Sequence, residues 1–119
     1  MNENIFWVLE TEIGENKLED LKALIKEMTE YTKSNESGAL NYEWFISEDN
    51  KKCTLYERYE NSEATLVHLS SFGKNFAKRF MEILTPKRFI VYGNPDEDVK
   101  NALNKMGCIY MTPAGGFSR

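Results

Sequence analysis

The sequence predicts an α+β domain, and three observations support that fold class. Several stretches carry side chains that alternate between two faces with period two, as paired strands do. Between them, other stretches carry apolar residues at helical spacing. The chain has 119 residues and is 41% hydrophobic, which suffices for one core. We therefore expect a single domain over residues 1–119.

The first half of the chain predicts a strand, a helix and a hairpin. Residues 5–13 carry apolar side chains on both faces, which indicates a strand in a sheet covered on both sides. A helix follows, for which Asn16 and Glu19 fit a capping box. Its apolar stripe consists of Leu18, Leu21, Leu24, Ile25, Met28 and Tyr31. Residues 39–47 and 52–59 alternate around a short polar turn, which predicts a hairpin.

The next part of the chain predicts a second helix and a strand. Asn61 or Ser62 can cap this helix. Its apolar face consists of Leu69, Phe72, Phe76, Phe80 and Ile83, and the weak helix formers that favour a break are Ser70, Ser71 and Gly73. Pro86 ends the helix, and residues 88–92 form a strand with apolar side chains on both faces.

The end of the chain predicts a third, short helix and a last strand. Asn94 and Pro95 fit a cap followed by proline at the first helical position, and Gly107 ends the helix. Its apolar stripe consists of Val99, Ala102, Leu103 and Met106. Residues 108–111 form the last strand. The segment 113–119 has no periodicity, which leaves a flap over a pocket, an arm onto a partner and terminal disorder all open.

The element order is strand, helix, strand, strand, helix, strand, followed by the helix and strand of the extension. This order is the split βαβ pattern of a ferredoxin-like βαββαβ domain, with a core at about residues 5–92 and a C-terminal extension at 93–119. Both long helices of such a domain cover one sheet face, so apolar residues on the other face need a second cover. Large aromatic residues on the predicted strands are Phe6, Trp7, Trp44, Phe45 and Tyr56. We therefore expect a homodimer packed sheet to sheet.

Composition excludes several classes of function. The net charge is −4 and the pI is about 5.1, which argues against nucleic-acid binding and against binding to an anionic membrane surface. No apolar run approaches a membrane span, and the N-terminal residues have no signal-peptide character, so we expect a cytoplasmic protein. Cys53 and Cys108 are expected to be free thiols, and no Cys/His cluster has the spacing of a metal site.

The chain from the hairpin to the second helix resembles the core motif of the antibiotic biosynthesis monooxygenase (ABM) family. The residues that carry the resemblance are Tyr56-Glu57-Arg58-Tyr59, Asn61-Ser62-Glu63-Ala64, His68, Phe72 and Phe76, together with Gly38-Ala39-Leu40-Asn41-Tyr42-Glu43. The resemblance covers about residues 5–92. It implies a dimeric α/β barrel, and an enzyme that oxidises quinol-like or anthrone-like polycyclic phenols with molecular oxygen and with no metal, flavin or haem cofactor.

The chemistry of such an enzyme singles out several residues. A deprotonated phenol is electron-rich enough to react with oxygen, so the protein must supply an apolar cavity, a proton acceptor and donors for an oxyanion. His68 is the one side chain that ordinarily titrates near neutrality, and it is the candidate for catalytic proton transfer. The candidate substrate-binding residues are Tyr42, Trp44 and Phe72 as an aromatic wall, and Tyr56, Glu57 and Arg58 as groups that orient a substrate oxygen.

Each of these residues also has a structural interpretation. His68 could hydrogen bond on the flank of its helix, and the phenylalanines of that helix are expected in the core. Glu57 and Arg58 point to opposite strand faces and need separate partners, for which structural ion pairs are favoured over catalysis. The haem-degrading branch of the family is disfavoured because residues 55–67 contain no tryptophan. The alternative to an oxygenase is a non-catalytic dimeric module that binds small molecules or acts in a stress response.

Overall fold

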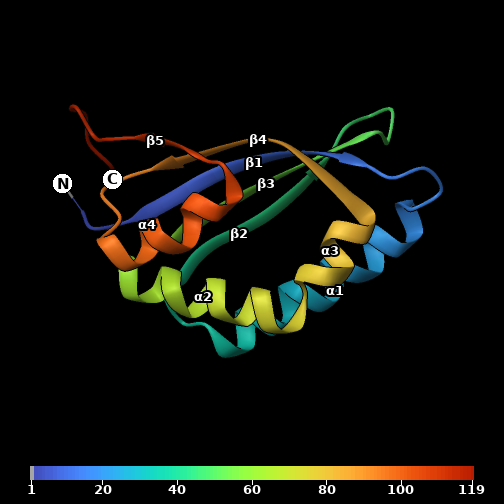
Figure 1. Cartoon of the computed structure of the whole chain (residues 1–119), viewed down its shortest axis with the longest axis horizontal. Coiled ribbons are helices and arrows are strands. Elements are labelled where there is room, and N and C mark those ends of the chain that lie inside the picture. The colour runs from blue at the N-terminus through green and yellow to red at the C-terminus, as the bar shows by residue number, and fades with distance from the viewer. Residues whose placement is uncertain (1) are drawn as a thin grey trace.

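The computed structural model describes residues 2–119 and contains one five-stranded sheet, with its helices gathered on one face (Figure 1). Met1 lies outside the described residues. The elements in chain order are β1 (Ile5–Ile13), α1 (Leu18–Asn35), β2 (Ala39–Ile46), β3 (Lys52–Tyr59), α2 (Ser62–Asn75), α3 (Ala77–Ile83), β4 (Leu84–Tyr92), α4 (Glu97–Leu103), a 3-10 turn η1 (Asn104–Met106) and β5 (Ile109–Met111). This order confirms the predicted ferredoxin-like α+β fold with a helix–strand extension.

The spatial order of the strands is β2-β3-β1-β4-β5. β1 is central and pairs antiparallel with both β3 and β4, while β2 pairs antiparallel with β3. β5 pairs parallel with β4. A parallel neighbour needs a crossover connection, and the segment of α4 and η1 supplies it. The extension therefore adds both a strand at the sheet edge and a helical cover beneath it.

Strand alternation divides the side chains between an inner face, which the helices cover, and an outer face. Trp7 of β1 and Tyr42 of β2 are both register partners of Glu57 on β3, so these side chains are neighbours on the inner face. One buried cluster lies between α1, α3 and β3. A second lies between α4, β1 and β4. His68 of α2 contacts the rings of Trp7, Tyr42 and Tyr59, and so lies where the two clusters meet.

Two helix starts differ from the predictions. Asn16 adopts a left-handed backbone with φ of 61°, and Lys17 precedes α1 without a side-chain cap, so the predicted capping box is wrong. Asn16 instead closes the turn after β1, a conformation that asparagine tolerates better than most residues. α4 is capped by Asp96, whose side chain accepts from the Val99 N–H, and not by Asn94. Asn61 does cap α2, accepting from the N–H of Ala64 as predicted.

The helical stretch after β3 breaks later than the weak helix formers indicated. α2 continues through Ser70, Ser71 and Gly73 to Asn75. The break between α2 and α3 falls at Phe76, whose side chain lies in the core. β4 begins at Leu84, so the predicted strand start at residue 88 is wrong. Pro86 lies inside β4, beside an irregularity in the pairing with β1. A proline is tolerated there because a bulge frees it from donating to the sheet ladder.

No described helix covers the outer face of the sheet (Figure 1). That face carries aromatic and apolar side chains. Phe6 stacks on Tyr92 with centroids 5.0 Å apart and meets Tyr56 edge-on at 6.2 Å. Phe45 at 55% and Met111 at 49% are among its exposed large apolar residues. The expectation of an apolar second face is therefore confirmed. No helix within residues 2–119 is long and apolar enough to cross a lipid bilayer.

Candidate functional site

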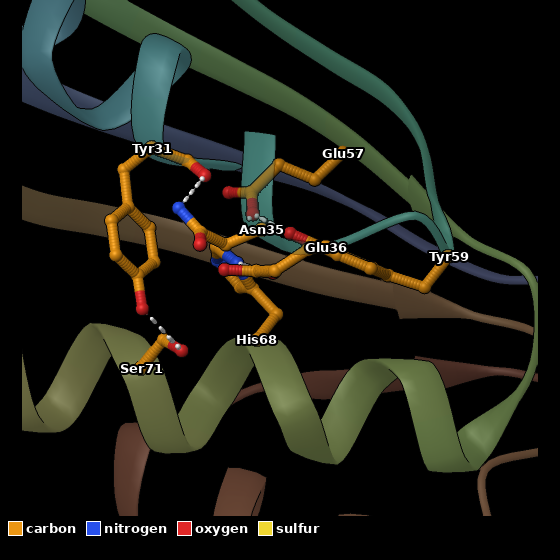
Figure 2. A network of polar contacts seen from close by, with 7 residues as sticks. All are labelled: Tyr31, Asn35, Glu36, Glu57, Tyr59, His68 and Ser71. Carbon is orange, nitrogen blue, oxygen red and sulfur yellow. Dashed lines mark hydrogen bonds and ion pairs between the residues drawn. The ribbon is translucent and has the colours of Figure 1, made fainter. Parts of the chain in front are cut away.

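The centre of the candidate site is His68, whose ring lies between two buried carboxylates (Figure 2). Nδ1 of His68 lies 2.8 Å from Oε1 of Glu36, and Nε2 lies 3.1 Å from Oε1 of Glu57. The hydroxyl of Tyr59 donates to the same Glu57 oxygen at 2.6 Å. None of the His68, Glu36 and Glu57 side chains is more than 7% exposed. Water therefore competes little with these contacts.

Three elements bring these side chains together. Asn61 caps α2 and so fixes the helix on which His68 faces the sheet. Glu57 and Tyr59 are two positions apart on β3, so both side chains project to the inner face. Glu36 stands at the C-terminus of α1, where its backbone N–H donates to the carbonyl of Thr32.

Gly38 allows α2 to approach this end of α1. A Cβ at residue 38 would lie 2.5 Å from the Cβ of Ala64 on α2, closer than side-chain atoms can pack. A larger residue would therefore displace α2, which carries His68. The glycine and the Glu36 carboxylate lie two residues apart, so one short turn sets both the approach of α2 and one partner of His68.

The carboxylates decide the charge of His68. Burial by itself lowers the pKa of His68, but hydrogen bonds and charge interactions with Glu36 and Glu57 outweigh it and raise the pKa to about 9. Burial raises the pKa of Glu57, yet the hydrogen bond and charge of His68, with the Tyr59 hydroxyl, bring it below its ordinary value. His68 is thus an imidazolium at neutral pH, and Glu57 is a carboxylate. The pair therefore places a positive charge beside a hydrogen-bond acceptor.

A cavity of about 500 Å³ opens beside this network. That volume lies within the range of small-molecule sites, roughly 300–1,000 Å³. Its lining is mainly aromatic and aliphatic, and its polar side chains are Tyr42, Glu57, His68, Thr85 and Lys105. Such a lining suits an aromatic ligand that brings one or a few polar atoms to fixed positions.

The Tyr42 hydroxyl is a polar group without a protein partner. It is buried, and no group within residues 2–119 makes a hydrogen bond of good geometry with it, although the side chains of Thr32 and Trp44 lie near it. Burial, followed by the nearby charge of Glu57, raises the pKa of Tyr42 well above its ordinary value. The hydroxyl therefore keeps its proton, and it can donate to a ligand oxygen once ligand binding uncovers it, because it has almost no accessible surface in the free protein. Tyr42 lines the cavity and is the register partner of Glu57, so such an oxygen would lie close to the His68 network.

The structure brings some of the sequence-predicted residues together and separates others. His68, Tyr42, Glu57 and Phe72 line the cavity. Trp44 lies behind the cavity wall and packs on the rings of Tyr42 at 6.0 Å and Phe80 at 6.1 Å.

Tyr56 and Arg58 lie on the outer face, because they occupy the strand positions that alternate with Glu57. Arg58 donates to the side chains of Asn4 and Asn41. Neither Tyr56 nor Arg58 borders the cavity, so neither can orient a ligand bound in it. The prediction that Glu57 and Arg58 face opposite sides is confirmed.

Sequence reasoning missed Glu36, Lys105 and Met106. Glu36 lies in a polar turn after a helix, where a glutamate ordinarily faces solvent, and its pairing with His68 spans 32 residues. The sequence feature that could have pointed to Glu36 was the nearby Gly38, because a glycine allows two elements to approach closely. Lys105 and Met106 border the cavity because the parallel pairing of β5 brings η1 beneath the sheet.

The residues present do not fit a metal centre. Among residues 2–119, no group of three or more His, Cys, Asp or Glu side chains is arranged to hold a metal ion. Both ring nitrogens of His68 are engaged by carboxylates, so ligation of haem iron by His68 would require one of those pairs to break.

Comparisons with known proteins agree with the fold. The model of the antibiotic biosynthesis monooxygenase family matches residues 5–80. Among solved structures, MupZ from Pseudomonas fluorescens is 25% identical with a TM-score of 0.86, and the match covers 100% of this chain and 91% of that one. Rv0793 from Mycobacterium tuberculosis is 26% identical with a TM-score of 0.62, covering 78% of this chain and 97% of that one.

A third solved structure is similar in fold alone. A variant of SnoaB, a cofactor-independent oxygenase from Streptomyces nogalater, is 9% identical with a TM-score of 0.64, covering 75% of this chain and 90% of that one. No curated protein matches the chain. The match to MupZ, unlike the other two, takes in the whole chain with α4, η1 and β5.

Proposed function

Because the chain belongs to the antibiotic biosynthesis monooxygenase family, we propose that it is a cofactor-independent monooxygenase acting on a quinol-like or polycyclic phenolic small molecule. The observation that carries the proposal is the placement of His68 between two carboxylates at the wall of an apolar cavity. Family membership supports a monooxygenase-type function. The cavity and its charges support the choice of an aromatic substrate that bears a hydroxyl group.

The reaction needs no external reductant. A phenol with a free para position reacts with O2 to give a quinone and water. One oxygen atom becomes the new carbonyl, and the other leaves as water with the hydrogen atoms of the hydroxyl and of the para carbon. The substrate supplies every electron. The protein has to promote loss of the hydroxyl proton, stabilise the anion that forms and return a proton to the oxygen that leaves.

The side chains of the site can divide these tasks. The Glu57 carboxylate borders the cavity and accepts the hydroxyl proton, while the adjacent imidazolium of His68 stabilises the phenolate. Glu57 returns this proton to the peroxide that forms on the para carbon. It then takes the proton of that carbon as the O–O bond breaks and passes it to the hydroxide, which leaves as water. Both N–H groups of His68 stay on carboxylates, so His68 acts through its charge. The Tyr42 hydroxyl donates to the substrate oxygen once binding uncovers it. We thus propose that His68 stabilises the successive anions, and that Glu57 takes the proton-transfer role that the sequence assigned to His68.

Oxygen uptake tests this proposal directly. Purified protein is incubated with a panel of quinols and anthrones beside His68→Gln, Val67→Ala and a no-protein autoxidation control. Val67 is the neighbour of His68 on α2 and is 49% exposed, so its truncation leaves the cavity intact. We expect uptake above autoxidation with the wild type and Val67→Ala, and its loss with His68→Gln. Equal rates in all samples would contradict the proposal.

The second candidate function is a non-catalytic module that binds small molecules in the same cavity. The low pKa of Glu57 favours it, because a carboxylate of low pKa is a weak base toward a phenol. A binder would show ligand-dependent increases in melting temperature without oxygen uptake. Thermal shift measurements on the same panel separate the two candidates.

We also propose that the protein forms a homodimer through the outer face of its sheet. The support is the apolar surface around Phe6, Tyr56 and Tyr92, a kind of surface that soluble monomers rarely leave open. Light scattering at micromolar concentration should give twice the chain mass. Phe6→Glu should lower it to the monomer mass, whereas Val67→Glu on the helical side should not. A monomer mass for the wild type would contradict the proposal.

A further inference from the structure

The opening of the His68 cavity is formed partly by residues outside the family match. Met81 of α3 and Met106 of η1 both border the cavity and yet are 59% and 45% exposed, so they lie where it meets solvent. Lys105, next to Met106, also borders the cavity and is exposed. The family match ends at residue 80, so all three side chains lie beyond it. The opening is therefore formed partly by residues that the family model does not cover.

Lys105 is the one lysine or arginine among the residues that border this cavity. No carboxylate in residues 2–119 lies within ion-pair distance of its ammonium group. The acidic group of the cavity, Glu57, is already held by His68 and Tyr59. An otherwise apolar cavity thus has an unpaired cation at its opening and a carboxylate–imidazolium pair in its interior.

Folded structure on both sides holds Lys105 at this position. Val99 and Leu103 of α4 are fully buried and fasten the helix that precedes it. The Tyr110 hydroxyl on β5 donates to the side chain of Asn104 at 2.7 Å, which connects η1 to the sheet. Gly107 ends the turn in the left-handed conformation, with φ of 68°. The lysine therefore stands on a supported turn, and only its side chain needs to move to meet a ligand.

We propose that Lys105 binds an anionic substituent of the ligand, a carboxylate or a phosphate ester, at the end remote from the hydroxyl that reaches Tyr42 and Glu57. An anionic substituent would define the substrate class of the proposed oxygenase. Its role in a reaction rests on that proposed function, whereas its binding to Lys105 does not. An anion at the opening stays partly hydrated and meets a cation. An anion placed deeper would face Glu57 in a dry cavity, at a high electrostatic cost. The charges therefore fix both the class of ligand and its orientation.

Matched ligands and variants test this inference by binding alone. The probes are a hydroxynaphthoic acid, its uncharged carboxamide and the corresponding hydroxynaphthyl phosphate. Trp7 borders the cavity, so quenching of tryptophan fluorescence gives Kd for each probe. The variants are Lys105→Met, which keeps the apolar stem, Lys105→Arg and Lys105→Glu. Lys51→Met, in the β2–β3 turn and away from the cavity, is the control.

We expect the wild type to bind the acid about five-fold more tightly than the carboxamide at low salt, the upper range for a partly exposed ion pair. The preference should vanish in Lys105→Met, persist in Lys105→Arg and Lys51→Met, reverse in Lys105→Glu and weaken as salt rises. Tighter binding of the acid than of the phosphate would assign a carboxylic acid ligand, and the reverse a phosphate ester. Equal Kd for acid and carboxamide in the wild type, or a preference that survives in Lys105→Met, would overturn the inference.

The binding test and the oxygen-uptake test can fail separately. A lysine-dependent preference for anions without oxygen uptake would leave the inference standing and remove the oxygenase. Oxygen uptake without any preference for anions would do the reverse.

Discussion

The charge of His68 gives a prediction about folding stability as a function of pH. In the folded chain its pKa is about 9, compared with an ordinary value of 6.5. Between these two pH values, the unfolded chain has released the imidazole proton and the folded chain still holds it. The free energy of unfolding should therefore fall as pH rises across this window. The stabilisation is complete below the unfolded pKa of 6.5 and is lost above the folded pKa of about 9.

The size of the effect follows from the two pKa values. A difference of about 2.5 between them corresponds to roughly 3 kcal/mol, at about 1.4 kcal/mol for each unit of pH. His68 is 5% exposed, so solvent screening removes little of it. This is a large share of the total stability that a domain of this size ordinarily has, about 5–15 kcal/mol. The wild type should consequently lose much of its stability under mildly alkaline conditions.

Two measurements check this prediction. Urea unfolding between about pH 6 and pH 9.5 gives the slope of stability with pH, and His68→Gln should lack the His68 contribution. The chain has a single histidine, so its ring proton resonance gives the pKa of His68 without assignment. Glu57→Gln should lower that pKa by removing one carboxylate. A midpoint at or below 6.5 in the wild type would refute the reasoning, because burial would then outweigh both carboxylates.

Substitutions at three further places test other parts of the structure by urea unfolding and ligand binding. Tyr42→Phe should change the free energy of unfolding by less than about 1 kcal/mol, because the hydroxyl has no protein partner, yet it should weaken binding of hydroxyl-bearing ligands. Gly38→Ala should cost about 1–3 kcal/mol through its clash with Ala64, and adding Ala64→Gly should recover most of that cost. Asp96→Ala should lower the free energy of unfolding by about 1 kcal/mol, because Asp96 is the cap of α4. Asn94→Ala should leave the free energy of unfolding unchanged. Equal losses in the two variants would contradict the assignment of Asp96 as the cap.

The sequence predicted most of the fold because period-two and helical patterns are local. The alternation of β3 placed Glu57 on one face and Arg58 on the other before any tertiary contact was known. Local rules failed where several residues could perform the same task. Asn16 is a good capping residue, but asparagine is also one of the few residues that tolerate a left-handed backbone. In the structure Asn16 adopts the left-handed turn and does not cap α1.

The candidate site was only half predictable, for a physical reason. His68 stood out because its chemistry is unique in the chain. Glu36 did not, because its partner is distant in sequence and a helix end carries no periodicity. The place of Lys105 beside the cavity could not be predicted without the crossover to β5, because it depends on how the extension packs beneath the sheet. Long-range packing decides which charged residues become buried, and one sequence does not encode that in any local pattern.

The contacts of His68 also determine which part of the molecule can open. To lift α2 away from the sheet, the protein would have to separate an imidazolium from two carboxylates and expose all three groups at once. Met81 and Met106, at the opening of the cavity, are partly exposed and form no ion pairs. Their flexible side chains change rotamer at little cost. Ligand exchange should therefore proceed past Met81 and Met106 on the timescale of side-chain motion, while the amide protons of α2 exchange slowly with solvent.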